Sequence, residues 1–472
     1  MPNETVTLVI LGASGDLTRR LLLPGLGTLL RARPVHEIRL IGAAFDDLDD
    51  PEWRSRVREA LGEGGCSAVN ADQMASATRF VHLDVTDADA MSAFLTGLAA
   101  PGNPIVLYFA LPPAVSQRAC EVLAEIEVPQ RLRLAIEKPF GSNLESARAF
   151  NRLLTRIVPE EQVFRVDHYL GKATVLNLLG LRFGNRLFEP VWNAANIERV
   201  EIIADETLAL EGRAGYYDRV GAAKDMIQSH LLLVLSILAM EQPARIDAIE
   251  LRDLMVHTLR ATQLWSGAAE TSSRRARYLA GAIGDRAVPD YVDEPGVDAA
   301  RQTETLAEVT VEIRNSRWSG VPFRLRSGKA LGDGFRGIVI RFKPVAYQPI
   351  GFHNEAVPNV MVIGLTPETL AVGITTNGEG DQWDLEQTIL SAELSESPVR
   401  PYGEILDGIL AGDPLLSVRG DVAEECWRIL DPMFEAWAAG TVPMDEYRAG
   451  TDGPTAWNQP ITPRRDRRSV SG

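Results

Sequence analysis

Hydrophobic residues follow two different patterns along this chain, and the change falls near residue 175. Before it, short apolar runs alternate with helical stretches, beginning with a run over 6–11 and an amphipathic stretch over 17–30. Further apolar runs occupy 38–43, 80–84, 105–109 and 132–137. Strands that alternate with helices predict βαβ units, and so a Rossmann-like domain with a parallel, doubly wound sheet over 1–175.

Beyond residue 175, strand-like segments follow one another with few helices between them. They lie at 198–204, 308–314, 323–326, 338–342, 360–365 and 370–374. Long helical patterns occupy 222–240 and 422–438, and the polar stretch 268–286 predicts a helix and a loop. We expect an α+β domain with a large, mostly antiparallel sheet over 176–462, followed by a disordered basic tail over 463–472.

Composition restricts the function more than the fold. Acidic side chains number 64 and basic ones 48, so the formal net charge is −16, which argues against nucleic acid or an anionic membrane as the main partner. Cys66, Cys120 and Cys426 show no paired spacing, so neither a disulfide framework nor a zinc site is expected. No apolar run reaches the roughly 18 residues that span a bilayer, and the first residues lack a signal-peptide pattern. We expect a cytoplasmic protein that binds no metal.

A glycine-containing turn directly follows the first apolar run. It reads Gly12-Ala13-Ser14-Gly15-Asp16-Leu17 and opens a helical stretch, which is the context that the phosphate loop of a dinucleotide site requires. Glycine permits a tight turn and close backbone approach, and the helix N-terminus presents free N–H groups to a pyrophosphate. Ser14 replaces the usual middle glycine, so a plain strand-to-helix turn is the alternative.

Cofactor selectivity depends on the residues that follow the second apolar run. A carboxylate there accepts from the ribose hydroxyls of NAD, whereas an arginine binds the extra phosphate of NADP. Asp46 and Asp47 occupy this place, with no basic residue before Arg54. They would repel a phosphate and can accept from a diol, or they belong only to a solvated acidic run. The arginines at 19–20 could still supply positive charge.

Two later clusters carry candidate chemistry, and the first lies within 165–172. It contains Asp167, His168, Tyr169 and Lys172. If Lys172 belongs to a helix that begins near His168, the two lie on one face, and with Tyr169 they can bind a phosphate by charge and hydrogen bonds. An ion-paired surface is the alternative.

The second cluster, over 224–230, leads into a strongly apolar helix and contains Asp225 and His230. Histidine titrates nearest neutrality and suits the removal of a hydroxyl proton, although a hydrogen-bonded core histidine is the alternative. An ideal α-helix does not place residues five apart on one face. Asp225 and His230 therefore reach one ligand only if Asp225 lies at the helix start or the turn is distorted.

Taken together, these motifs resemble the glucose-6-phosphate dehydrogenase family nearly from end to end. The Asp-His-Tyr-Leu-Gly-Lys string at 167–172 is the most specific of them, beside the glycine turn at 12–17. Other matching motifs lie at 110–113, 137–141, 181–186, 192–193, 211–213, 224–231, 239–241, 321–323, 328–331, 427–432 and 449–450.

The resemblance implies the roles of the catalytic residues. His230 is the general base for the anomeric hydroxyl, Asp167 orients it, and Lys138 lies between sugar and nicotinamide. The implied substrate-binding residues are His168, Tyr169 and Lys172 for the phosphate, Asp225 and Glu206 for sugar hydroxyls, and Lys329. The implied cofactor-binding residues are Gly12, Ala13, Ser14, Gly15, Asp16, Leu17, Asp46 and Lys138.

Several positions depart from the family pattern. Phe45 replaces the arginine that usually binds the NADP phosphate, and the segment 332–335 loses two cations. Thr366 replaces a glutamine and Gly364 an arginine of the sugar site. Other departures are Lys224 in place of arginine, and Leu254, Met255 and His257 in place of charged residues.

The resemblance therefore implies oxidation of glucose 6-phosphate to 6-phosphogluconolactone by a homodimer or homotetramer. NADP is the expected cofactor, while NAD or dual use stays open because of Phe45. The alternatives are a dehydrogenase for another hexose phosphate and a catalytically weak paralogue that binds sugar phosphate. Retention of Asp167, His230 and Lys172 together argues against the paralogue, since a binding module needs no base.

Overall fold

The computed structural model describes residues 5–33, 37–98 and 102–457, so the tail predicted over 463–472 lies outside the described residues. Two compact units are defined by their internal contacts. Unit 1 comprises Met1–Leu176, Pro243–Val256 and Ser397–Trp427, and unit 2 comprises Asn177–Gln242, His257–Glu396 and Arg428–Gly472. Three of the divisions between the units fall inside helices, which are α7 (Ala173–Phe183), α10 (Ala248–Arg260) and α13 (Gly420–Ala438). Two later segments thus join the N-terminal unit, and no local pattern of the sequence predicts this.

Unit 1 is built on a six-stranded parallel sheet in the order β3-β2-β1-β4-β5-β6, which confirms the expected Rossmann-like fold. The strands are β1 (Thr5–Leu11), β2 (Glu37–Ala44), β3 (Arg79–His82), β4 (Ile105–Phe109), β5 (Leu132–Glu137) and β6 (Val163–Val166). Every residue of β4 is buried, as expected for a parallel sheet that is covered on both faces. The strand order reverses between β1 and β4, and such a point is where open α/β sheets bind ligands.

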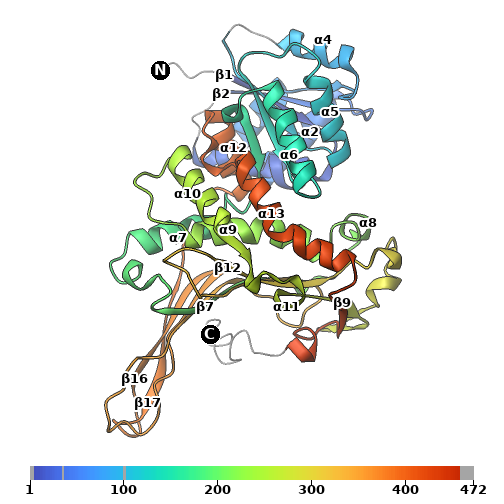
Figure 1. Ribbon diagram of the computed structural model, residues 1–472. Helices are drawn as coiled ribbons and strands as arrows, with labels where there is room; N and C mark the ends of the chain where they lie inside the picture. Colours follow the sequence, from blue (N-terminus) through green and yellow to red (C-terminus); the bar gives the residue numbers. More distant parts are fainter. Residues whose placement is uncertain (1–4, 34–36, 99–101, 458–472) are drawn as a thin grey trace. The chain divides into compact units, whose positions relative to one another are not determined.

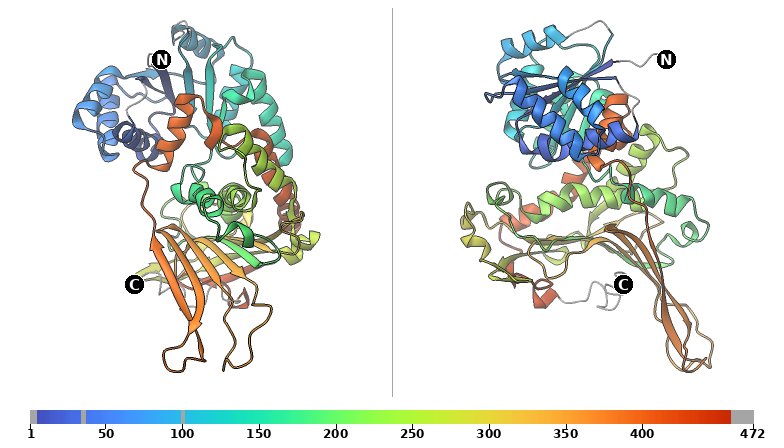
Figure 2. Two further views of the ribbon diagram at one scale, coloured as in Figure 1. Left: turned by 90° about the vertical axis from the view of Figure 1, so that its left-hand side faces the viewer. Right: turned by 180° about the vertical axis from the view of Figure 1, so that it is seen from behind.

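The helices of unit 1 contact one another in two sets. One set joins α1, α2, α3 and α12, and the other joins α4, α5 and α6; Figure 2 shows the helices of unit 1 on both sides of its sheet. Their bounds are η1 (Thr18–Leu22), α1 (Leu23–Ala32), α2 (Asp50–Glu63), α3 (Ala68–Ala77), α4 (Ala88–Leu98), α5 (Pro113–Leu123), α6 (Leu144–Ile157), η2 (Glu160–Gln162), α12 (Pro401–Ala411) and η8 (Pro414–Leu416).

Unit 2 contains a ten-stranded sheet in the order β17-β16-β15-β14-β7-β13-β12-β9-β18, with β8 paired to β12. The pairs β7–β13 and β9–β18 are parallel and the others antiparallel, so the expected mostly antiparallel sheet is confirmed; β16 and β17 form its long hairpin (Figure 1). The strands are β7 (Ile197–Asp205), β8 (Thr262–Leu264), β9 (Ser273–Leu279), β12 (Leu306–Ile313), β13 (Phe323–Gly328), β14 (Arg336–Phe342), β15 (Val360–Thr366), β16 (Glu368–Asn377), β17 (Leu385–Glu393) and β18 (Met444–Arg448). A separate ribbon pairs β10 (Gly281–Ile283) with β11 (Arg286–Val288).

Two consecutive, largely buried helical segments pack against this sheet. The first is the π-helix η4 (Ala223–Leu231), which contacts β7, β12 and β13, and the second is α9 (Leu232–Ala239), whose residues are all buried. Although α9 is apolar apart from Ser236, no helix in the described part of the chain has the length and apolar character needed to cross a bilayer. The remaining short helices are η3 (Glu189–Val191), α8 (Ala214–Tyr217), η5 (Trp265–Gly267), α11 (Ala269–Ser272), η6 (Tyr291–Asp293), η7 (Ala299–Arg301) and η9 (Thr455–Trp457).

The helix and loop predicted over 268–286 are wrong for most of that segment. Only α11 is helical, and the chain then forms the strands β9, β10 and β11. The strand β9 was not predicted because its sequence, SRRARYL, contains three arginines and so lacks an apolar strand pattern. The buried Arg275 is tolerated because its Nε and Nη2 donate to the Val442 carbonyl oxygen at 3.1 and 3.0 Å, which satisfies the charge-bearing group inside the fold.

Candidate active site

The turn after β1 has the backbone geometry of a phosphate-binding loop. Gly12 has a φ of +82°, and a Cβ there would lie 2.3 Å from the Ala110 carbonyl oxygen, so the close approach to the segment after β4 requires glycine. The N–H groups of Gly12 and Ala13 donate to the Ala43 carbonyl oxygen at 2.8 and 3.1 Å. The loop is thereby fixed at the point where the strand order reverses, and its backbone fits a dinucleotide pyrophosphate.

The segment after β2 places Asp46 beside this loop. The Ser14 hydroxyl donates to the Asp46 carboxylate, while the Phe45 ring is 69% exposed and lies 5.3 Å from the His82 ring. Arg56, on α2, donates to the Ser14 carbonyl oxygen at 3.3 Å. Sequence reasoning missed Arg56, because only the folding of α2 against the loop brings this cation there.

Residues Asp167 to Lys172 form successive tight turns directly after β6. The N–H groups of Leu170, Gly171 and Lys172 each donate to the carbonyl oxygen three residues earlier, at 3.1, 3.2 and 3.2 Å. The condition that Lys172 belongs to a helix beginning near His168 is therefore not met, since α7 begins only at Ala173. Residues three apart eclipse in such turns, and the Lys172 Nζ accordingly lies 4.4 Å from the Tyr169 ring centre.

Aromatic side chains surround His168 within unit 1. Its ring lies 5.2 Å from Tyr169 and stacks on Tyr402 at 5.6 Å with 13° between the planes. Gly171 permits the approach of α12, because a Cβ there would lie 2.4 Å from the Pro401 carbonyl oxygen. Sequence reasoning missed Tyr402, which comes from the late segment of the chain that joins unit 1.

Two acids lie near each other at the ends of β5 and β6. Asp167 is buried and its Oδ1 accepts from the Tyr169 N–H at 3.0 Å, while Glu137 accepts from the Tyr108 hydroxyl at 2.6 Å. Burial raises the pKa of Glu137 to about 7, the Tyr108 hydrogen bond opposes this rise, and the charge of Asp167 adds to it. Glu137 therefore holds its proton through part of the neutral range and adds less negative charge beside Asp167. Lys138 follows it directly and is joined to Pro139 by a cis peptide bond.

The π-helical form of η4 resolves the spacing of the second cluster. Asp225 and His230 are five residues apart within η4, and the i→i+5 hydrogen bonds of a π-helix place such residues about one turn apart. This is the distorted turn that the sequence required for both to serve one ligand. His230 is 2% exposed, and the Asp225 Oδ1 accepts from the Tyr216 hydroxyl at 3.1 Å.

Unit 2 also holds an ion-paired group at the ends of β7, β13 and β14. Glu206 forms ion pairs with Lys329 and with Arg336, and the Lys329 Nζ lies 5.1 Å from the Tyr217 ring centre. Arg336 is a third residue that sequence reasoning missed. It follows the segment 332–335, which lacks the family's cations, and pairs in register with Thr366. Arg336, directly after this segment, therefore supplies a cation that pairs with Glu206.

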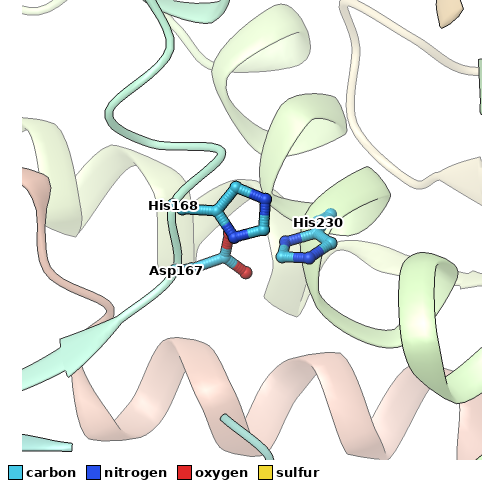
Figure 3. A group of neighbouring side chains, drawn as sticks. All are labelled: Asp167, His168 and His230. Atoms are coloured by element: carbon cyan, nitrogen blue, oxygen red, sulfur yellow. The ribbon is translucent and has the colours of Figure 1, made fainter. Parts of the chain in front are cut away.

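The predicted site residues thus fall into two sets. Unit 1 supplies the glycine loop, Asp46, Lys138 and the turn over 167–172, and unit 2 supplies Glu206, Asp225, His230 and Lys329. Figure 3 shows the side chains of Asp167 and His168, from the turn after β6, and of His230, from η4. The chemical groups present are a buried imidazole, several carboxylates and three lysines, which suit a polar, anionic substrate.

Comparison with known proteins gives matches over almost the whole chain. The model of the glucose-6-phosphate dehydrogenase NAD binding domain matches residues 9–177, and that of the C-terminal domain matches residues 179–468. Glucose-6-phosphate 1-dehydrogenase 2 of Mycobacterium tuberculosis is 37% identical, covering 95% of this chain and 91% of the relative. Glucose-6-phosphate 1-dehydrogenase of Dickeya dadantii is 36% identical, covering 99% and 98%.

Solved structures give the same result. A glucose-6-phosphate dehydrogenase in complex with its substrate glucose-6-phosphate matches with a TM-score of 0.87 and 28% identity, covering 96% of each chain. Glucose-6-phosphate 1-dehydrogenase from Mycobacterium avium matches with a TM-score of 0.84 and 31% identity, covering 98% of this chain and 100% of the other. The present chain belongs to the glucose-6-phosphate dehydrogenase family.

Proposed function

We propose that this chain oxidises glucose 6-phosphate to 6-phosphogluconolactone, the first oxidative step of the pentose phosphate pathway, in the cytoplasm and as a homodimer or homotetramer. The observation that carries the proposal is the buried His230 on a π-helical turn, in a chain that matches the family over nearly its full length. A sugar-binding relative without catalysis would have no use for a buried base there.

His230 removes the proton from the anomeric hydroxyl. Its neutral imidazole suits this step because histidine titrates near neutral pH. Asp167 orients the imidazole and stabilises the imidazolium that forms, as in His–Asp pairs generally. A bound nicotinamide cofactor supplies the hydride acceptor, and Lys138 contacts both sugar and cofactor.

The sugar phosphate is held by two sets of residues, one for the phosphate and one for the sugar hydroxyls. His168, Tyr169 and Lys172 bind the phosphate, and the packing of the Lys172 ammonium over the Tyr169 ring supports their acting together. Asp225 and Glu206 accept from sugar hydroxyls, and Lys329 donates. Phosphate binding remote from the anomeric carbon positions that carbon for hydride and proton transfer.

The residues around the expected adenosine end support the use of both NADP and NAD. The glycine loop, with the close approach at Gly12, takes the pyrophosphate of either cofactor. Asp46 suits the ribose diol of NAD, whereas Arg56 is a cation at the same loop. We propose that the enzyme uses both cofactors. Phe45 stands where the family usually has the phosphate-binding arginine, whereas Arg56 supplies a positive charge at the glycine loop.

Initial rates of nicotinamide reduction test the activity. Glucose 6-phosphate should be oxidised with NADP and with NAD, and the ratio of the two kcat/KM values measures the cofactor preference. Absence of turnover with either cofactor, in protein whose circular dichroism shows a folded chain, would rule the activity out. A large preference for NADP would contradict the roles given to Phe45 and Asp46.

A substitution at Phe45 should move the preference. Phe45→Arg should raise kcat/KM for NADP about tenfold relative to NAD, because a guanidinium forms charge-assisted hydrogen bonds with the ribose phosphate. Phe45→Leu is the matched control, since it removes the same exposed ring without adding charge. If both variants shifted the ratio equally, the effect would come from the ring and not from the charge.

A second candidate, a dehydrogenase for another hexose phosphate, is favoured by Thr366 and by the altered segment 332–335. The Arg336–Glu206 ion pair changes the groups available to sugar hydroxyls. Rates with mannose 6-phosphate and galactose 6-phosphate, measured beside glucose 6-phosphate, separate the two candidates.

A further inference from the structure

A buried acid holds the N-terminus of η4. Glu304, two residues before β12, is 7% exposed. Its carbonyl oxygen accepts from the Ala222 N–H at 3.3 Å, and its carboxylate Oε1 accepts from the Ala223 N–H at 2.9 Å. An acid at this end satisfies N–H groups that lack partners within a helix and is favoured by the helix dipole.

The chain before η4 passes unusually close to this carboxylate. Gly221 has a φ of +71°, and a Cβ there would lie 2.5 Å from the Glu304 Oε1. A side chain at Gly221 would be strained by its own backbone and would displace the buried carboxylate. Glu304 and Gly221 therefore form one closely fitted contact.

The next residue, Thr305, is hydrogen-bonded to the backbone of Lys329, another residue of the proposed sugar site. Its carbonyl oxygen accepts from the Lys329 N–H at 2.9 Å. The Tyr447 hydroxyl lies 2.9 Å from the Thr305 Oγ1 and donates to the Lys329 carbonyl oxygen at 2.6 Å. Glu304 and Thr305, which we call the 304–305 strap, thus connect η4 to the backbone of Lys329.

The segment before the strap is itself fixed through Asp218. The Thr303 hydroxyl donates to the Asp218 carbonyl oxygen at 2.6 Å, and the Asp218 carboxylate accepts from the Tyr291 hydroxyl at 2.7 Å and pairs with Arg301. These hydrogen bonds and this ion pair form a connected network, which makes the 304–305 strap a rigid support.

We propose that Glu304 is a positioning residue that keeps η4 in its π-helical register and, through Thr305, sets where Asp225 and His230 lie relative to Lys329. Without the acceptor at Ala223, the first turn can relax to α-helical bonding, in which residues five apart are rotated by about 140°. The inference rests on the substrate and catalytic roles proposed for these three residues. We therefore expect substitution of Glu304 to lower kcat by more than any loss of stability would explain.

Three variants test the strap through kcat and KM for glucose 6-phosphate, the melting temperature, and the dissociation constant of the cofactor. Glu304→Ala and Gly221→Ala should each lower kcat about 10- to 100-fold, because small displacements of catalytic groups cost rates of this order. Cofactor affinity should stay unchanged, since the glycine loop lies in unit 1. Glu304→Gln should stay within about threefold of the parent enzyme, because its amide oxygen still accepts from the Ala223 N–H.

Glu308 supplies a matched control on the adjoining strand β12. It is also a buried acid, but it pairs with Arg274 and Arg324 and has no bond to η4 among the described contacts. Glu308→Ala should lower the melting temperature while kcat of the folded enzyme is retained.

Parent-like kcat in Glu304→Ala or Gly221→Ala would overturn the inference, as would a Glu304→Gln variant as slow as Glu304→Ala. If Glu304→Ala does not fold, the contrast between Gly221→Ala and Glu304→Gln decides. The His230→Asn variant separates this inference from the proposed function. An active His230→Asn enzyme contradicts the roles on η4, whereas an inactive one beside a fully active Gly221→Ala enzyme contradicts only the strap.

Discussion

Replacement of His230 by asparagine should lower kcat by about 10²- to 10⁴-fold, the usual contribution of a positioned general base. Asparagine retains a hydrogen-bonding group of similar size but cannot accept the hydroxyl proton at neutral pH. The dissociation constant for glucose 6-phosphate should therefore stay near that of the parent enzyme. Stopped-flow measurement of the chemical step and equilibrium binding of the sugar phosphate check the two parts separately.

His168 offers the matched control for this result. It carries the same side chain, but it stacks on Tyr402 at 5.6 Å and is assigned to the phosphate. His168→Asn should raise KM for glucose 6-phosphate and leave kcat at saturation much less affected. If the two histidine variants lost kcat to the same extent, the separation of base and phosphate ligand would be wrong.

The sequence predicts the Rossmann-like unit well because most of its strands, with the exception of β3, are largely buried. Such strands appear as continuous apolar runs, and five of the six strands could be located in this way. The exception is β6, where Arg165 interrupts a short run. That arginine is fully buried and pairs with Glu160, so its charge is satisfied by a partner that no local pattern reveals.

The site is predictable in its residue types but not in its geometry. The π-helical form of η4 cannot be predicted from periodicity, because its sequence is that of an ordinary amphipathic helix and leads into the almost entirely apolar α9. Only the five-residue spacing of Asp225 and His230 indicated a distortion. Tyr402, Arg336 and Glu304 reach their neighbours through tertiary packing, and their sequence positions carry no trace of these contacts.

Replacement of Lys172 by alanine should raise KM for glucose 6-phosphate about 10- to 100-fold, since a hydrogen bond to a charged group contributes about 1.5–3 kcal/mol. The loss should appear in binding, because the phosphate lies away from the bonds that change. Lys172→Arg should recover part of the affinity, although a planar guanidinium cannot reproduce the position of an ammonium that packs over Tyr169 at 4.4 Å.

A substrate without a phosphate tests the interaction between Lys172 and the phosphate directly. With glucose, the parent enzyme and Lys172→Ala should have similar kcat/KM values, because the side chain has nothing left to bind. The ratio of losses for the two substrates then gives the coupling between Lys172 and the phosphate, as in a double-mutant cycle. An equal loss with both substrates would mean that Lys172 acts by supporting the turn over 167–172 and through it Asp167, so that positioning of the base, and not phosphate binding, would be its main contribution.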